Sequence, residues 1–175
     1  MTAILSLFRL SAPMRLALLF LLAVCLPAQA MVPTPVFVLH AYSQEYPWSK
    51  GQHQGFVDAL NADTGRAYSL NVEYLDTKRV GYSPAYADLI GAHLAQKYKG
   101  YRPAAVYVTD DNALSFALTH LDRVFPGVPV FFSGINDYGI RARLDPARMT
   151  GVFERKDSSI PTSMPPLSRA TASTT

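Results

Sequence analysis

The segments that follow predicted strands gather carboxylates, amides, hydroxyls and aromatic rings. An Asp-Asp-Asn triplet stands at 110–112, and a Tyr-Ser pair at 42–43 precedes Trp48. Such a mixture suits recognition of a small polar ligand, because aromatic faces stack on the ligand while Asn, Asp and Ser fix its orientation. The candidate ligand contacts are Tyr42, Ser43, Trp48, Asp110, Asp111, Asn112 and Asn136.

The acidic pair Asp110 and Asp111 could instead act as base or nucleophile in an exported α/β hydrolase or phosphatase. The lysine that phospho-acceptor chemistry requires at a later strand end is not evident in the sequence. Ser133 stands in Phe-Phe-Ser-Gly-Ile, which lacks the first glycine of a nucleophile elbow. We therefore predict a binding protein that is not an enzyme, and keep the hydrolase as the alternative.

Motifs for cofactors and metals are missing from the sequence. Neither G-x-G-x-x-G nor G-x-x-x-x-G-K-[ST] occurs, so nucleotide phosphates have no recognisable cradle. Consecutive histidines are separated by 13, 40 and 27 residues, which is not the spacing of metal ligands. The four histidines are His40, His53, His93 and His120. We expect them to be ordinary helix or strand-end residues, and we expect neither a metal nor a cofactor.

Each candidate also has a purely structural interpretation. Asp111 or Asn112 is well placed to cap the helix that follows, because short polar side chains accept hydrogen bonds from the first backbone amides. Asp76 and Arg79 could simply pair with each other on the surface. Trp48 could pack at the start of a helix, since large aromatic side chains mostly serve burial. Asn136 would serve a turn equally well.

The elements that position these residues alternate between strand and helix. Apolar runs predict strands at 36–40, 68–74, 104–109, 128–132 and 149–153. Helical spacing of apolar residues predicts helices at 48–61, from Pro84 up to Gly100, and from Asp111 or Asn112 to Phe125. This rhythm predicts an α/β fold with a doubly wound parallel sheet. Ligands bind such sheets beyond the carboxyl ends of the strands, where the candidates stand.

Residues 1–30 predict a secretory signal peptide. Two arginines precede an unbroken apolar run at 16–26, and an Ala-Gln-Ala site ends at Ala30. A membrane span needs about 20 apolar residues, so this run is short for one. We predict cleavage after Ala30 and a periplasmic location, with anchoring by an uncleaved signal as the alternative. Cys25, the one cysteine, lies inside the run, so the mature chain would hold no thiol.

Composition narrows the function classes further. With 49% hydrophobic and 17% charged residues, the 175-residue chain is not a disordered protein of high charge, and its length suits about one domain. The net charge is +3, and the first 30 residues carry two of these positive charges, which leaves +1 for the rest of the chain. The rest of the chain therefore lacks the excess of basic residues that is typical of nucleic-acid-binding proteins. Residues 158–175 hold nine Ser or Thr and three Pro, which indicates a disordered or frameshifted tail.

Five ordered blocks of the chain together resemble one bacterial family. The blocks are the Val-Phe-Val-Leu-His-Ala-Tyr run with Tyr-Pro-Trp at 36–48, and the segments at 72–79, 108–114, 125–137 and 150–154. They resemble the ABC-transporter substrate-binding-like sensor domains, which occur as free solute-binding proteins and at the N-terminus of sensor histidine kinases and diguanylate cyclases.

This resemblance implies a type I periplasmic-binding-protein fold, in which two α/β lobes close on a ligand. Residues 31–157 would form the first lobe alone. The implied function is an extracytoplasmic solute-binding or sensory domain that recognises a small polar ligand for transport or transmembrane signalling. Its partner would be a membrane transporter or a sensor kinase. Besides the hydrolase, a non-functional truncated gene product remains an alternative.

Overall fold

The structure, a computed structural model, describes residues 32–154. The predicted signal peptide at 1–30 and the predicted tail at 158–175 lie outside these residues, so both stay predictions. None of the helices described within 32–154 combines the length and the hydropathy that a membrane span needs.

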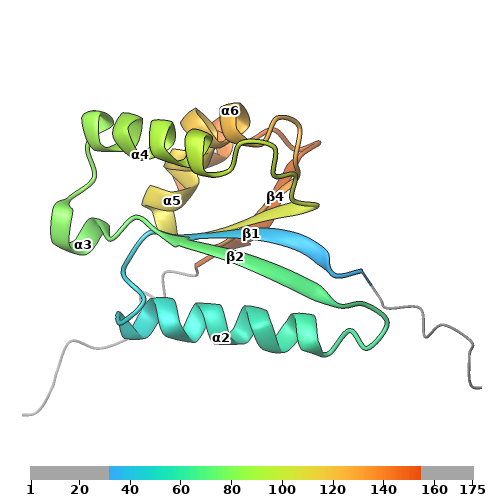
Figure 1. The fold of residues 1–175 in the computed structure, drawn as a ribbon. Coiled ribbons are helices and arrows are strands. Elements are labelled where there is room, and N and C mark those ends of the chain that lie inside the picture. Colours follow the sequence, from blue (N-terminus) through green and yellow to red (C-terminus); the bar gives the residue numbers. More distant parts are fainter. Residues whose placement is uncertain (1–31, 155–175) are drawn as a thin grey trace, which may run out of the picture. The chain divides into compact units, whose positions relative to one another are not determined.

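The described residues form an α/β fold around one sheet of five parallel strands (Figure 1). The strands lie in the order β2-β1-β3-β4-β5. Their bounds are β1 Thr34–His40, β2 Tyr68–Tyr74, β3 Ala105–Thr109, β4 Val130–Ile135 and β5 Met149–Phe153. All four pairings are parallel, so the predicted doubly wound parallel sheet is confirmed.

Helices cover both faces of the sheet. Helix α2, Pro47–Asn61, lies on one face, while α4, Pro84–Lys97, and α5, Asp110–Phe116, lie on the other (Figure 1). The shorter elements are α3 Thr77–Val80, the π-helical η2 Ala117–Leu121, α6 Asp122–Val124 and the 3-10 helix η3 Tyr138–Arg143. Parallel strands need such crossover connections, because a tight turn cannot return the chain to the same end of the sheet.

The main core lies between the sheet and the α4–α5 layer. Phe37 of β1 is fully buried there, and its ring contacts those of Tyr98 and Phe125 at centroid distances of 5.1 and 4.7 Å. On the opposite face, the ring of Phe56 in α2 stacks on Tyr107 of β3 with centroids 4.0 Å apart. Phe37 is in register with Val106, so the next residue, Tyr107, faces the opposite side of the sheet, as the period of a strand requires.

Local sequence explains where the long helices begin. Pro84 occupies the first turn of α4, where its missing N–H costs nothing, and the Ser83 side chain accepts a hydrogen bond from the Tyr86 amide at 3.2 Å. Pro47 plays the same part in α2. The predicted start of α4 at Pro84 is confirmed, and β2 and β5 have the predicted bounds.

The predicted cap at Asp111 or Asn112 is wrong. Helix α5 begins at Asp110, before both predicted cap residues. Its N-cap is Thr109, whose side chain makes no capping hydrogen bond. The reason is that the side chains of Asp111 and Asn112 are bound elsewhere, to the loops after β4 and β2. The predicted third helix is also interrupted, because residues 117–121 take up a π-helical turn.

Candidate functional site

The centre of the candidate site is a pair formed by Asp110 and Trp48. Asp110 directly follows β3 and is only 3% exposed, whereas Trp48 at the start of α2 is 43% exposed. The indole Nε1 of Trp48 donates a hydrogen bond to Oδ1 of Asp110 at 2.8 Å. The second oxygen, Oδ2, is buried and has no hydrogen-bond partner among the described residues. An exposed aromatic ring thus lies against a buried and half-satisfied carboxylate.

The backbone at this edge of the sheet is strained. Within residues 32–154, Asp76 and Asp110 are the two non-glycine residues with positive φ, at 53° and 69°. Both lie just beyond the carboxyl end of a strand, β2 and β3 respectively. Residues in this left-handed region cost of order 1 kcal/mol or more, and they concentrate at ligand-binding and catalytic positions.

The surroundings of Asp110 favour its neutral form. Burial raises the pKa of Asp110 to about 6, although the hydrogen bond from Trp48 acts to lower it. The neighbouring carboxylates of Glu154 and Asp111 raise it further. The site is therefore a negative environment, in which one more negative charge is unfavourable.

Tyr42, in the loop after β1, is affected by the same carboxylates. Burial raises the pKa of Tyr42 to about 12, and the carboxylates of Asp110 and Asp111 add to the effect. The ammonium of Lys78 lies 4.7 Å from the centroid of the Tyr42 ring, within reach of a cation–π interaction. One face of this ring already holds a cation.

Asp111 and Asn112 tie the loops of the site to one another. Oδ1 of Asp111 accepts hydrogen bonds from the backbone amides of Asn136 and Asp137, at 2.9 and 3.0 Å, and so fixes the loop after β4. Nδ2 of Asn112 donates to the Thr77 hydroxyl at 2.9 Å, which in turn donates to the Ala41 carbonyl. Side chains after β3 thereby hold the loops that follow β1, β2 and β4.

The structure brings most of the predicted contacts together, but in different roles. Trp48 and Asp110 are in direct contact, and the carboxylates of Asp110 and Asp111 act on the Tyr42 hydroxyl. Asp111 and Asn112 hold the loops in place. Asn136 is exposed and is held through its backbone amide. Ser43 belongs to a turn, where its carbonyl accepts the Tyr46 amide at 3.2 Å. The predicted surface pair of Asp76 and Arg79 is present, with Nε and Oδ2 2.8 Å apart.

Sequence reasoning missed the residues beside Trp48 on the α2 face. Tyr107, Ser133 and Gln52 form a hydrogen-bonded chain, 2.6 Å from Tyr107 to Ser133 and 2.5 Å from the Ser133 hydroxyl to Oε1 of Gln52. The side-chain amide of Gln52 packs closely against Gly134, whose φ is 71°. A Cβ added to Gly134 would lie 2.6 Å from Nε2 of Gln52. Glu154, directly after β5, could have been found by the same strand-end rule that found Asp110.

These side chains line an open groove between α2 and the sheet. Its volume is about 430 Å³, and its lining residues are Trp48, Gly51, Gln52, Gly55, Phe56, Tyr107, Ser133, Gly134 and Glu154. Trp48 belongs both to the groove and to the pair with Asp110, so a ligand in the groove would contact the site directly.

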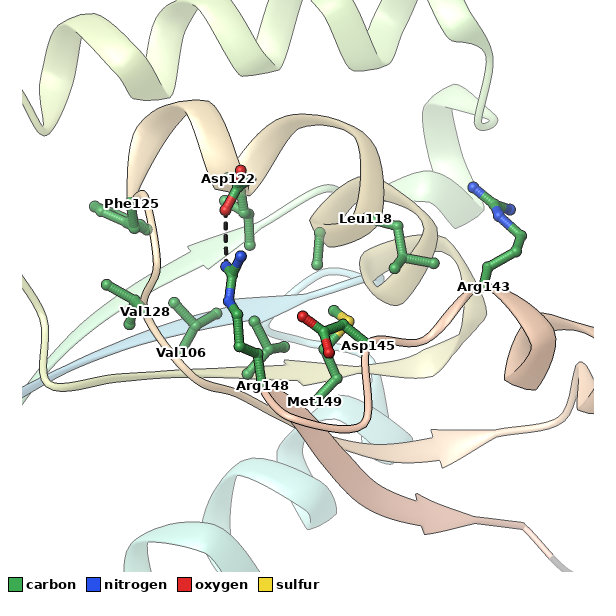
Figure 2. Close-up of a pocket in the computed structure, with 12 residues that line it drawn as sticks. Val106, Leu118, Asp122, Phe125, Val128, Arg143, Asp145, Arg148 and Met149 are labelled. Atoms are coloured by element: carbon green, nitrogen blue, oxygen red, sulfur yellow. Dashed lines mark hydrogen bonds and ion pairs between the residues drawn. The ribbon is translucent and has the colours of Figure 1, made fainter.

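A second hollow lies away from the candidate residues. Figure 2 shows it between the α5–α6 stretch and the amino ends of the strands, with Arg148 paired to Asp122 at 2.7 Å. Its volume is about 210 Å³ and its remaining lining is largely apolar, including Val106, Phe125 and Met149. The ion pair across it closes the end of the core, and we assign this hollow a structural role.

The histidines form a pair that the spacing of the sequence does not suggest. Nε2 of His40 lies 3.1 Å from Nδ1 of His53, and Nδ1 of His40 lies 2.9 Å from the Thr109 hydroxyl. Burial, together with His53, lowers the pKa of His40 to about 4. No group of three or more His, Cys, Asp and Glu side chains suited to a metal ion occurs within the described residues.

Comparisons with models of protein families, with curated proteins and with solved structures found no match.

Proposed function

We propose that residues 31–157 are the ligand-binding lobe of an exported solute-binding or sensory protein that recognises a small polar ligand. The observation that carries the proposal is the Trp48–Asp110 pair at the carboxyl edge of the sheet. A buried carboxylate oxygen without a partner costs about 1–3 kcal/mol, and a strained backbone adds to that cost. A ligand that donates to this oxygen would offset it.

The cross-tied loops support the same function. Asp111 and Asn112 fix the loops after β4 and β2 before any ligand arrives, so little ordering is needed on binding. Such a site acts without covalent chemistry. Binding would shift an equilibrium between open and closed arrangements, which a membrane transporter or sensor kinase in contact with the periplasmic protein would read.

The alternative, an exported hydrolase, has one observation in its favour. The pKa of Asp110 is about 6, which suits a general base near neutral pH. Against it, Asp111 is engaged by two backbone amides, and Oδ1 of Asp110 is engaged by the Trp48 indole. Turnover of an ester or phosphate substrate that Asp110→Asn abolishes would favour the hydrolase.

Thermal unfolding of the full chain against a library of small polar metabolites tests the proposal. A ligand at 100 times its dissociation constant stabilises the folded state by roughly 2.7 kcal/mol, which raises the midpoint by several degrees. We expect one compound class to raise it in the wild type and not in Asp110→Asn. Asp58→Asn, which changes an exposed carboxylate on α2, is the matched control. A library that leaves the midpoint unmoved would overturn the proposal.

A further inference from the structure

Carboxylates gather around the Trp48–Asp110 pair, and the Lys78 ammonium at this edge lies against the Tyr42 ring. The carboxylates of Asp111 and Glu154 both act on Asp110, and both also act on the Tyr42 hydroxyl. In the part of the chain that the structure describes, no ion pair neutralises any of these three carboxylates. An anionic ligand group placed here would be repelled, and a cation would be attracted.

Aromatic rings complete this environment. The Trp48 indole is 43% exposed and also lines the groove along α2. Tyr42 already receives the Lys78 ammonium 4.7 Å from its ring centroid, which shows that an ammonium fits against a ring at this edge. Aromatic faces attract ammonium groups by about 0.5–2 kcal/mol, and Trp does so best.

The unpartnered Oδ2 of Asp110 determines which chemical group the ligand must present to it. Oδ2 of Asp110 can only accept when the carboxylate is ionised, so its partner must be a donor. A charged donor makes a hydrogen bond roughly twice as strong as a neutral donor does, and it also relieves the repulsion from Glu154 and Asp111. An ammonium group meets both requirements.

We propose that the ligand of this site is a small molecule that carries an ammonium group, bound between the Asp110 carboxylate and the Trp48 ring. This inference rests on the proposed function. Because Oδ2 is buried, the ammonium reaches it when the Trp48 indole rotates away from its hydrogen bond with Oδ1. Binding therefore changes the surroundings of the indole.

The chain offers a direct readout, because Trp48 is its only tryptophan. Fluorescence of the full chain is titrated with two matched sets of a cation, a neutral molecule and an anion: phenethylamine, phenethyl alcohol and phenylacetate, then putrescine, 1,4-butanediol and succinate. We expect a saturable change with an amine and at least tenfold weaker binding of its neutral and anionic counterparts. The compound that most raises the unfolding midpoint is compared with its own des-amino analogue in the same way.

Two variants assign the effect to the carboxylate. Asp110→Asn keeps the shape of the side chain and an acceptor for Trp48, and it should weaken amine binding at least tenfold, to the level of the neutral analogue. Asp58→Asn removes an exposed carboxylate of α2 and should leave the affinity unchanged. Circular dichroism establishes that both variants fold before the titrations are compared.

The two proposals fail differently. Neutral or anionic analogues that bind as tightly as the amines, or amine binding that Asp110→Asn leaves intact, would overturn the ammonium inference and leave a ligand-binding lobe standing. Absence of binding in both sets, together with a library in which no compound raises the midpoint, would overturn the proposed function itself.

Discussion

Asp110 combines three features that each lower stability. Its backbone is left-handed, its carboxylate is buried, and one carboxylate oxygen lacks a partner among the described residues. Features of this kind persist where the surrounding structure enforces them, and they cluster at functional positions. The sequence predicted Asp110 as a contact because it follows a strand, but not its burial, which depends on where the Trp48 ring lies.

The pH dependence of the free energy of unfolding should reveal the titration of Asp110. Its folded-state pKa of about 6 is above the ordinary value of 3.8, so the ionised carboxylate disfavours folding at neutral pH, and this cost declines as the pH falls from about 6 toward 3.8. His40 acts in the opposite direction. Its pKa of about 4 is below the ordinary 6.5, so stability is lost as the pH falls from 6.5 toward 4.

Each shift corresponds to about 3 kcal/mol, so the two effects nearly cancel in the wild type. We predict that the free energy of unfolding changes little between pH 6.5 and pH 4, whereas Asp110→Asn loses about 3 kcal/mol over that interval. Urea denaturation followed by circular dichroism measures both. Parallel pH profiles for the two proteins would show that Asp110 does not titrate as described.

At the scale of elements, hydrophobic period predicted the existence and order of all five strands but not every boundary. β3 begins one residue after its prediction, at Ala105, and β4, predicted at 128–132, runs from Val130 to Ile135. β2 and β5 have the predicted bounds, and β1 begins two residues before its prediction, at Thr34. The cap of α5 was mispredicted because a local rule cannot see that the Asp111 side chain is engaged by the loop after β4, 25 residues away in sequence. Such contacts are tertiary, and no periodicity encodes them.

This contact gives a second prediction. Asp111→Ala removes the acceptor of the Asn136 and Asp137 amides and should destabilise the fold by about 1–3 kcal/mol. Hydrogen exchange of these two amides should become markedly faster. Exchange of the β1 amides should change only as much as the global free energy of unfolding does. Asp111→Asn keeps an acceptor oxygen and should retain most of the protection. If alanine and asparagine behave alike, the carboxylate does not hold this loop.

At the scale of the whole described domain, one part of the sheet lacks a cover. Phe131 of β4 is 44% exposed and Val152 of β5 is 67% exposed. Phe131 pairs in register with Tyr107, so it faces the side of the sheet on which α2 lies. Parallel sheets are normally covered on both faces, so this apolar area should favour association.

We predict that the chain associates at higher concentration and that Phe131→Thr weakens the association severalfold, because threonine suits a strand but presents less apolar surface. Sedimentation velocity over a range of concentrations measures it. Leu89→Thr, at an exposed leucine on α4, is the control for loss of any surface hydrophobe. Equal effects of the two substitutions would mean that the β4–β5 face has no special part. The same face would be exposed in a truncated gene product.

A ligand that binds through the Trp48–Asp110 pair must change the surroundings of the single indole N–H of the chain. The ¹H–¹⁵N resonance of Trp48 Nε1 is followed while the compound that most stabilises the full chain is added. We predict a saturable shift of this resonance in the wild type, and none in Asp110→Asn at the same concentration. A compound that raises the unfolding midpoint while leaving the indole resonance in place would show that the ligand binds elsewhere on the molecule.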